Sequence, residues 1–162
     1  MIDSILNLYA RNLDFAHRLV ADLPDEKMAV QPAAKMNHAA WVIGHLAWAA
    51  DDIAGKRQFG LERIMPAKFD GAFDHKSAPT DNRTVYPDKV TLVKYLDDSH
   101  ERVAAALKAR GDSFLVQPTT DPIFAKRFPQ MGGTLLHLMI GHEQMHLGQL
   151  SAWRRAQGLP AV

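Results

Sequence analysis

The chain has 162 residues, of which 47% are hydrophobic and 23% are charged, the composition of an ordinary globular domain. Nineteen Lys and Arg residues against eighteen Asp and Glu residues give a net charge of +1, so no nucleic-acid or anionic-membrane partner is expected. The absence of cysteine excludes disulfides, thiolate metal sites and cysteine nucleophiles. No secretory leader and no membrane-spanning stretch is recognised, which favours a cytoplasmic protein with one domain over residues 1–162.

Four proline-poor segments carry apolar residues every three or four positions, the spacing that predicts amphipathic or buried helices. Asn37, Pro87 and Thr134 are the expected starting residues of the second, third and fourth helices, as caps or as a first-turn proline. The expected helices span Ile2 to Leu23, Asn37 to about Arg57, Pro87 to Arg110, and Thr134 to Gly158. No segment alternates with the period of a strand. The sequence therefore predicts an all-α four-helix bundle with a long crossover connection, about residues 58–86, between helices two and three.

Histidines are the unusual feature, with eight in the chain, and histidine is a common neutral metal ligand. His142 and His146 are four residues apart on the fourth helix, so they share its core-facing side. His45 lies on one face of the second helix with Trp41 and Trp48. Each histidine alone is more often a hydrogen-bonded core residue, but three together would leave unpaired polar groups unless they shared a divalent metal.

Two further polar residues are candidates for a role at this site. His100 lies on the apolar face of the third helix, as an extra ligand, a distal acid–base group or a satisfied core histidine. Gln149 follows His146 by one turn, where it would orient a bound species or a ligand ring, or make a core hydrogen bond. His38 is expected to be a helix cap, a residue at the rim of the site or a surface residue. His137 is expected to face away from the ligand pair, and His17 and His75 are expected to be solvated.

Two familiar motifs overlap His142–His146 and neither is satisfied. The pattern H-E-x-x-H occurs in zinc proteases, but the chain after His146 contains no Asp, Glu or His for a downstream ligand. Glu143 and His146 also form one E-x-x-H unit, whereas di-iron bundles need two such units and further inward glutamates. Glu143 is therefore expected to flank or support the metal ligands.

Segments of the second and fourth expected helices resemble those of a known protein family. The segments Trp41–Leu46 and His142–Leu150, followed by Arg154-Arg155 and Gly158–Pro160, are similar to those of the DinB-like (DinB/YfiT) superfamily. The resemblance implies a four-helix bundle in which His45, His142 and His146 hold a metal. Members of that family include thiol-dependent S-transferases and a mycothiol-dependent maleylpyruvate isomerase. Homodimers are common among them, so the resemblance also implies a homodimeric assembly.

These considerations lead to a functional expectation. A divalent metal on three histidines, zinc or nickel with iron or manganese as alternatives, would keep an open position. It would activate water or a low-molecular-weight thiol for attack on a small electrophile, a transferase-like or hydrolase-like reaction, with His100 and Gln149 as catalytic candidates. The alternatives are a non-catalytic, stress-associated metal-binding bundle and a helical module without metal.

Overall fold

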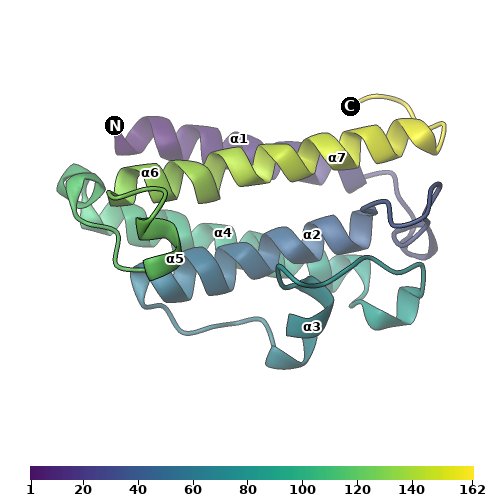
Figure 1. The fold of residues 1–162 in the computed structure, drawn as a ribbon. Coiled ribbons are helices and arrows are strands. Elements are labelled where there is room, and N and C mark those ends of the chain that lie inside the picture. The colour runs from purple at the N-terminus through teal and green to yellow at the C-terminus, as the bar shows by residue number, and fades with distance from the viewer.

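The computed structural model describes residues 1–162 and consists of four long helices with short helical turns between them (Figure 1). The long helices are α1 (Ile2–Val20), α2 (Ala39–Trp48) with its continuation Ala49–Gln58, α4 (Lys89–Arg110), and α6 (Met131–Leu135), which continues through Leu136–His142 into α7 (Glu143–Ala156). The short elements are α3 (Asp70–Phe73), α5 (Pro122–Ala125) and the 3₁₀ turns Asp25–Lys27, Ala67–Phe69, Arg83–Val85 and Asp112–Val116. The only strand-like pairing is an isolated bridge between Pro118 and Gln130. The all-α prediction is therefore confirmed.

Helix direction explains why the chain needs a crossover. α1 packs against α4 and α7, and α2 packs against α4 and α7. In Figure 1, α1 and α7 run in one direction, and α2 and α4 run in the other. Because α2 and α4 are parallel neighbours, residues 59–88 must return along the bundle before α4 can begin. None of the helices combines the length and the apolarity needed to traverse a bilayer.

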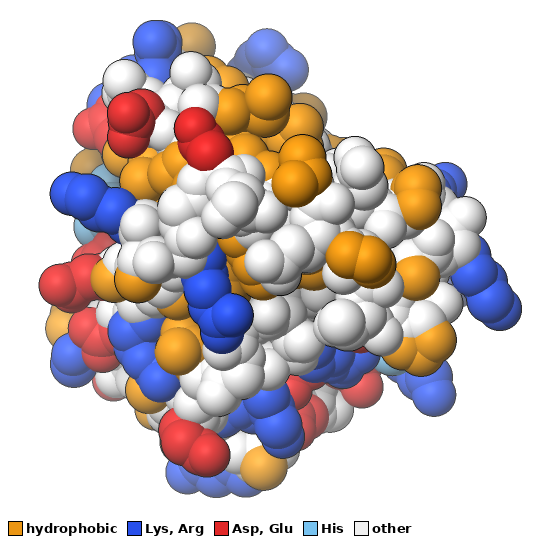
Figure 2. Space-filling view, turned by 90° about the vertical axis from the view of Figure 1, so that its left-hand side faces the viewer, with side chains coloured by type: hydrophobic (Ala, Val, Ile, Leu, Met, Phe, Trp, Pro, Cys, Tyr) orange, Lys and Arg blue, Asp and Glu red, His pale blue; other side chains and the backbone are white.

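The core is one cluster of 37 buried hydrophobic residues that joins the four helices. Every residue of α2 is buried, as expected for a helix that is apolar on all sides and covered by neighbours and by the crossover. Met145, between the buried α7 residues Glu143 and His146, is in contrast 52% exposed. At the end of the bundle that faces the viewer in Figure 2, acidic and basic side chains alternate around exposed apolar ones. This end therefore carries no extended surface of a single charge.

The predicted starts of two helices shift by one or two residues in the structure. His38, rather than Asn37, caps α2, because its Nδ1 accepts a hydrogen bond from the backbone N–H of Trp41 at 3.2 Å. Asp88 caps α4 through the N–H of Thr91 at 2.7 Å, so Pro87 lies before the helix and not at its first position. In both cases a side-chain acceptor aimed at the first turn determines where the helix begins.

The start of the fourth helix, in contrast, was predicted too late. α6 begins at Met131, so Gly132, Gly133 and Thr134 lie inside the helix and Thr134 is not its cap. The Thr134 side chain is buried and its hydroxyl pairs with the hydroxyl of Thr119 at 2.9 Å. Thr134 therefore fixes the preceding connection against the helix.

Two segments of the bundle are π-helical, Ala49–Gln58 and Leu136–His142. A π-helix forms i→i+5 hydrogen bonds, so residues five apart come to share a face, and such segments are frequent at functional sites. The guanidinium of Arg57 accordingly reaches back to Asp52, five residues earlier. One π-helical segment follows His45 and the other ends at His142, so both adjoin the candidate site.

Candidate metal centre

Three histidines converge from two long helices. His45 comes from α2, His142 from the end of the second π-helical segment and His146 from α7, and one ring nitrogen of each lies within 4.8 Å of the others. The Nε2 atoms of His45 and His142 are 3.1 Å apart. This separation is close to that spanned by two ligands of one ion with metal–nitrogen bonds of about 2.0–2.1 Å. The three-histidine cluster therefore fits a metal-binding site.

The outer nitrogens of two of these rings are held by hydrogen bonds. Nδ1 of His45 donates to the backbone carbonyl of Phe73 at 2.6 Å. Nδ1 of His146 donates to Oε1 of Gln149 at 2.9 Å, and this oxygen also accepts from the side-chain amide of Asn37 at 2.8 Å. Metal-bound histidines characteristically donate their second N–H to such acceptors, which fixes the tautomer and orients the ring. Both rings therefore keep the Nε2 lone pair available for a metal ion.

The third ring, His142, provides the test of whether a cation fits. Its Nδ1 is buried without a hydrogen-bond partner, and its Nε2 faces the lone pair on Nε2 of His45. With the proton on Nδ1, two lone pairs point at each other; with the proton on Nε2, Nδ1 is a buried acceptor without a donor. Either state is costly in a dry interior. A shared cation would accept both facing lone pairs, so the donor set matches a divalent metal of the imidazole-binding class.

Burial also keeps the three rings in the neutral form that binds metals. It lowers the pKa of His45. Burial, followed by the nearby His146 and His45, lowers the pKa of His142 to about 3. Burial and the proximity of His45 lower the pKa of His146 to about 4. At neutral pH the cluster therefore does not need to release protons to bind a cation.

A cleft of about 460 Å³ opens onto the cluster, a size typical of small-molecule sites. Trp41 and Trp48 line it on either side of His45, with ring centroids 4.6 Å and 6.1 Å from the imidazole. Ile123 and Phe124, both within α5, line it as well. The walls beside the histidines are thus mainly aromatic and aliphatic, which suits a ligand with an apolar body.

The crossover supplies hydrogen-bond partners for the polar groups along α2. Residues later in the crossover meet residues earlier in α2, so the two segments run antiparallel. The pairs are His38 with the carbonyl of Thr80 (2.8 Å), the Trp41 indole with Ser77 Oγ (3.0 Å), His45 with the carbonyl of Phe73 (2.6 Å), and the Trp48 indole with Asp70 Oδ1 (3.1 Å). The long connection therefore positions the site residues of α2.

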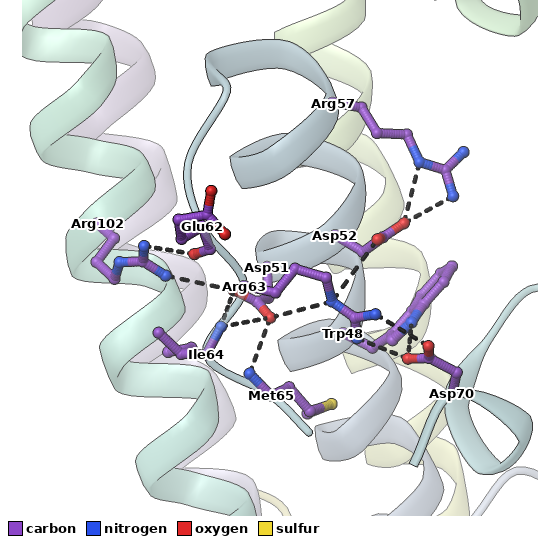
Figure 3. A network of polar contacts seen from close by, with 10 residues as sticks. All are labelled: Trp48, Asp51, Asp52, Arg57, Glu62, Arg63, Ile64, Met65, Asp70 and Arg102. Carbon is purple, nitrogen blue, oxygen red and sulfur yellow. Dashed lines mark hydrogen bonds and ion pairs between the residues drawn. The ribbon is translucent and has the colours of Figure 1, made fainter. Parts of the chain in front are cut away.

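A network of charged groups extends this pairing beyond Trp48 (Figure 3). Buried Asp51 accepts hydrogen bonds from the backbone N–H groups of Ile64 and Met65 at 3.0–3.1 Å. Arg63 binds both carboxylate oxygens of Asp70 at 2.9 Å and 2.6 Å. The bidentate pair ties the first part of the crossover to the segment that contacts Trp48 and His45.

His100 lies outside the three-histidine group and does not line the cleft. It is buried, its Nε2 is 2.7 Å from Oε1 of Glu143, and its ring stacks on Tyr9 with centroids 3.8 Å apart. The amide of Asn12 donates to the other oxygen of Glu143 at 3.1 Å. Burial raises the pKa of Glu143, and His100 opposes that shift. The pair supports the helix turn that carries His142, in keeping with a flanking role for Glu143.

The prediction that His137 faces away from the ligands is wrong. Its ring centroid is 6.3 Å from that of His142, and it lines the cleft. The prediction assumed α-helical geometry, whereas His137 and His142 lie five apart in a π-helical segment and therefore share a face. The ring of His137 stacks on Phe128 at 5.1 Å.

The remaining histidines differ in how well their positions were foreseen. His38 is a buried helix cap and not a surface residue. His17 is partly exposed and pairs with Asp97 at 2.6 Å. His75 is exposed, as expected, but it stands at the rim of the cleft.

Two residues at the site, Phe73 and Arg57, were not predicted from the sequence. Phe73 acts through its backbone carbonyl, which any residue possesses, and Arg57 reaches the cleft from the other π-helical segment. Only the i, i+5 spacing of Asp52 and Arg57, read as a π-helical turn, would have hinted at that placement.

The fold and the site together define a class, namely all-α bundles with three histidines from two helices at the base of a cleft. The model of the DinB superfamily matches residues 9–150 of the chain, and the chain belongs to this superfamily. The comparison with curated proteins gave no match.

Proposed function

We propose that the protein is a metal-dependent enzyme that transfers a low-molecular-weight thiol or water onto a small electrophile. The observation that carries the proposal is the combination of three converging histidines with a cleft that opens onto them. Structural zinc sites are closed by four protein ligands, whereas catalytic sites keep one position for water or substrate. His100, which the sequence offered as an extra ligand, is bonded to Glu143 instead.

The residues of the chain have separate roles in this proposal. His45, His142 and His146 would hold a divalent cation, zinc or nickel with iron or manganese as alternatives. Such a cation supplies Lewis acidity, which lowers the pKa of a bound water or thiol. Gln149 is a positioning residue that orients His146, and His100 is a positioning residue that acts through Glu143 on the turn carrying His142. Trp41 and Trp48 exclude water from the apolar part of the electrophile.

A second candidate function is a non-catalytic, stress-associated metal-binding bundle, in which the cation mainly stabilises the fold. Its support is the burial of two of the three histidines within the hydrophobic core. The two candidates share the metal and differ in turnover. The resemblance to the DinB-like superfamily also supports a homodimer, which light scattering on the purified protein would test.

The metal claim is tested on untagged protein by mass spectrometry of the wild type, His142→Ala and His75→Ala. We expect about one cation per chain in the wild type and in His75→Ala, because His75 is exposed and outside the cluster, and a loss in His142→Ala. Equal and near-zero content in all three would refute the metal centre.

Turnover is tested by incubating the metal-loaded protein with small electrophiles, with and without low-molecular-weight thiols. We expect products that His142→Ala does not form. Full metal occupancy without product from any electrophile would favour the non-catalytic bundle.

A further inference from the structure

The lining of the cleft is asymmetric in charge. Beside the three clustered histidines, its polar side chains are those of Arg57, His75, Ser77 and His137. No Asp or Glu side chain lines it, although the chain contains eighteen acidic residues and two of them, Asp52 and Asp70, are bonded to the lining residues Arg57 and Trp48. An organic cation would therefore find no carboxylate partner in the cleft, whereas an anionic ligand would find the guanidinium of Arg57.

Arg57 is the one permanently charged group of this lining. Its Nε and Nη2 both donate to a single oxygen of Asp52, at 3.0 Å and 2.6 Å. Asp52 is buried and does not line the cleft. Figure 3 shows Arg57 at the end of the charged network, with Asp52 between it and the other members. The Asp52 carboxylate thus holds the guanidinium of Arg57 from outside the cleft.

One edge of this guanidinium remains available. Nη1 of Arg57 makes no hydrogen bond to the protein, and the side chain is 35% exposed. A guanidinium has five donors in a rigid fork, and the edge that Asp52 does not occupy still presents donors from Nη1 and Nη2. That edge matches the geometry of a carboxylate.

We propose that the cleft selects small molecules that carry a carboxylate on a flat apolar body, with Arg57 as the residue that determines this specificity. The carboxylate binds the free edge of Arg57, and the body lies among Trp48, Ile53 and Phe124, which line the same cleft. This inference rests on the proposed function only in treating the cleft as the substrate site.

The experiment compares benzoate with benzamide, which share a ring and differ in charge. Binding is followed by tryptophan fluorescence, because two of the three tryptophans line the cleft. Each titration is done with metal-free and with zinc-loaded protein. In the metal-free wild type we expect benzoate to bind about tenfold more tightly than benzamide, the effect of one charge-assisted contact.

Three variants identify the source of the preference. We expect Arg57→Gln to abolish it while benzamide affinity is kept, and Arg57→Lys to retain part of it, because the charge remains but the fork is lost. Arg155→Gln, an exposed change on α7 outside the cleft, should leave it unaltered. Circular dichroism of each variant shows whether it is folded.

Several outcomes would overturn the inference. One is equal affinity of the wild type for both probes, and another is a preference that survives in Arg57→Gln. A third is a preference that appears only with zinc and does not depend on Arg57, since the carboxylate would then bind the cation. Because the metal-free arm needs no cation, failure of the metal centre and failure of this inference give different results.

Discussion

Phe73 supports His45 in two ways, through its carbonyl and through its ring. The carbonyl accepts the Nδ1 proton of His45 at 2.6 Å, and the ring occupies the space beside Gly44, the residue before His45. A Cβ at Gly44 would lie 2.0 Å from Cε1 of Phe73. Glycine at this position therefore permits the close approach that brings the carbonyl to the histidine.

Gly44→Ala should consequently displace Phe73 and weaken the support of His45. We expect a loss of about 1–3 kcal/mol in the free energy of unfolding, the usual cost of overpacking a core, together with weaker metal binding. Urea denaturation measures the first effect. Gly148→Ala is the matched control, because a Cβ there meets nothing within 4 Å in the middle of α7, and it should stabilise by about 0.5–1 kcal/mol. Equal stability of the two variants would contradict this account of Phe73.

Gln149→Leu removes the acceptor for Nδ1 of His146 without touching the ligand itself. Outer hydrogen bonds of this kind typically contribute about 10–100-fold to metal affinity. We expect a loss of that size in a competition titration with a chromophoric zinc chelator. Gln144→Leu changes an exposed glutamine on the same helix and should have no effect. Unchanged affinity in Gln149→Leu would show that the ring is oriented by packing alone.

The depressed pKa values of the cluster make the metal-free protein sensitive to acid. An unfolded histidine titrates near 6.5, whereas folding lowers the pKa of His142 to about 3 and that of His146 to about 4. Between these values the unfolded chain binds more protons, so lowering the pH favours unfolding. We expect the free energy of unfolding of metal-free protein to fall from pH 6.5 to pH 5 and to be nearly flat above pH 7. Urea titrations at each pH should give a shallower fall for the double variant His142→Leu/His146→Leu.

His100 and Glu143 form a buried pair, and its disruption should lower the free energy of unfolding. His100→Leu leaves the Glu143 carboxyl with Asn12 as its only hydrogen-bonded side chain in the core, at a cost of about 3 kcal/mol. The double variant His100→Leu/Glu143→Leu should cost less than the sum of the two single changes. Chemical denaturation of the wild type, His100→Leu, Glu143→Leu and the double variant gives the four free energies of unfolding that this comparison needs. Strict additivity would mean that the two groups do not interact.

Periodicity and proline placement were sufficient to predict the four helices and the crossover, because both reflect local rules of the backbone. The pairing of His142 with His146 was predictable for the same reason, since four residues separate them along one helix. The position of His137 was not, because the prediction assumed 3.6 residues per turn and the segment is π-helical. Helix starts failed where capping side chains such as those of His38 and Asp88 decided them.

The part of the site that the sequence could not reveal comes from the crossover. Its contributions are a carbonyl at Phe73, a hydroxyl at Ser77 and a carboxylate at Asp70, each placed by tertiary contacts. No spacing rule relates these residues to α2, because the crossover is mostly irregular and runs opposite to the helix. Arg63, which holds Asp70, likewise has no recognisable motif.

The antiparallel attachment of the crossover to α2 limits how its length can change. Surface connections usually tolerate insertions and deletions, but here Asp70, Phe73, Ser77 and Thr80 each meet a fixed partner on the helix. One residue added or removed between two of these points would shift every later contact out of alignment. Related chains should therefore vary more freely in length near residues 111–121 than between Arg63 and Thr80.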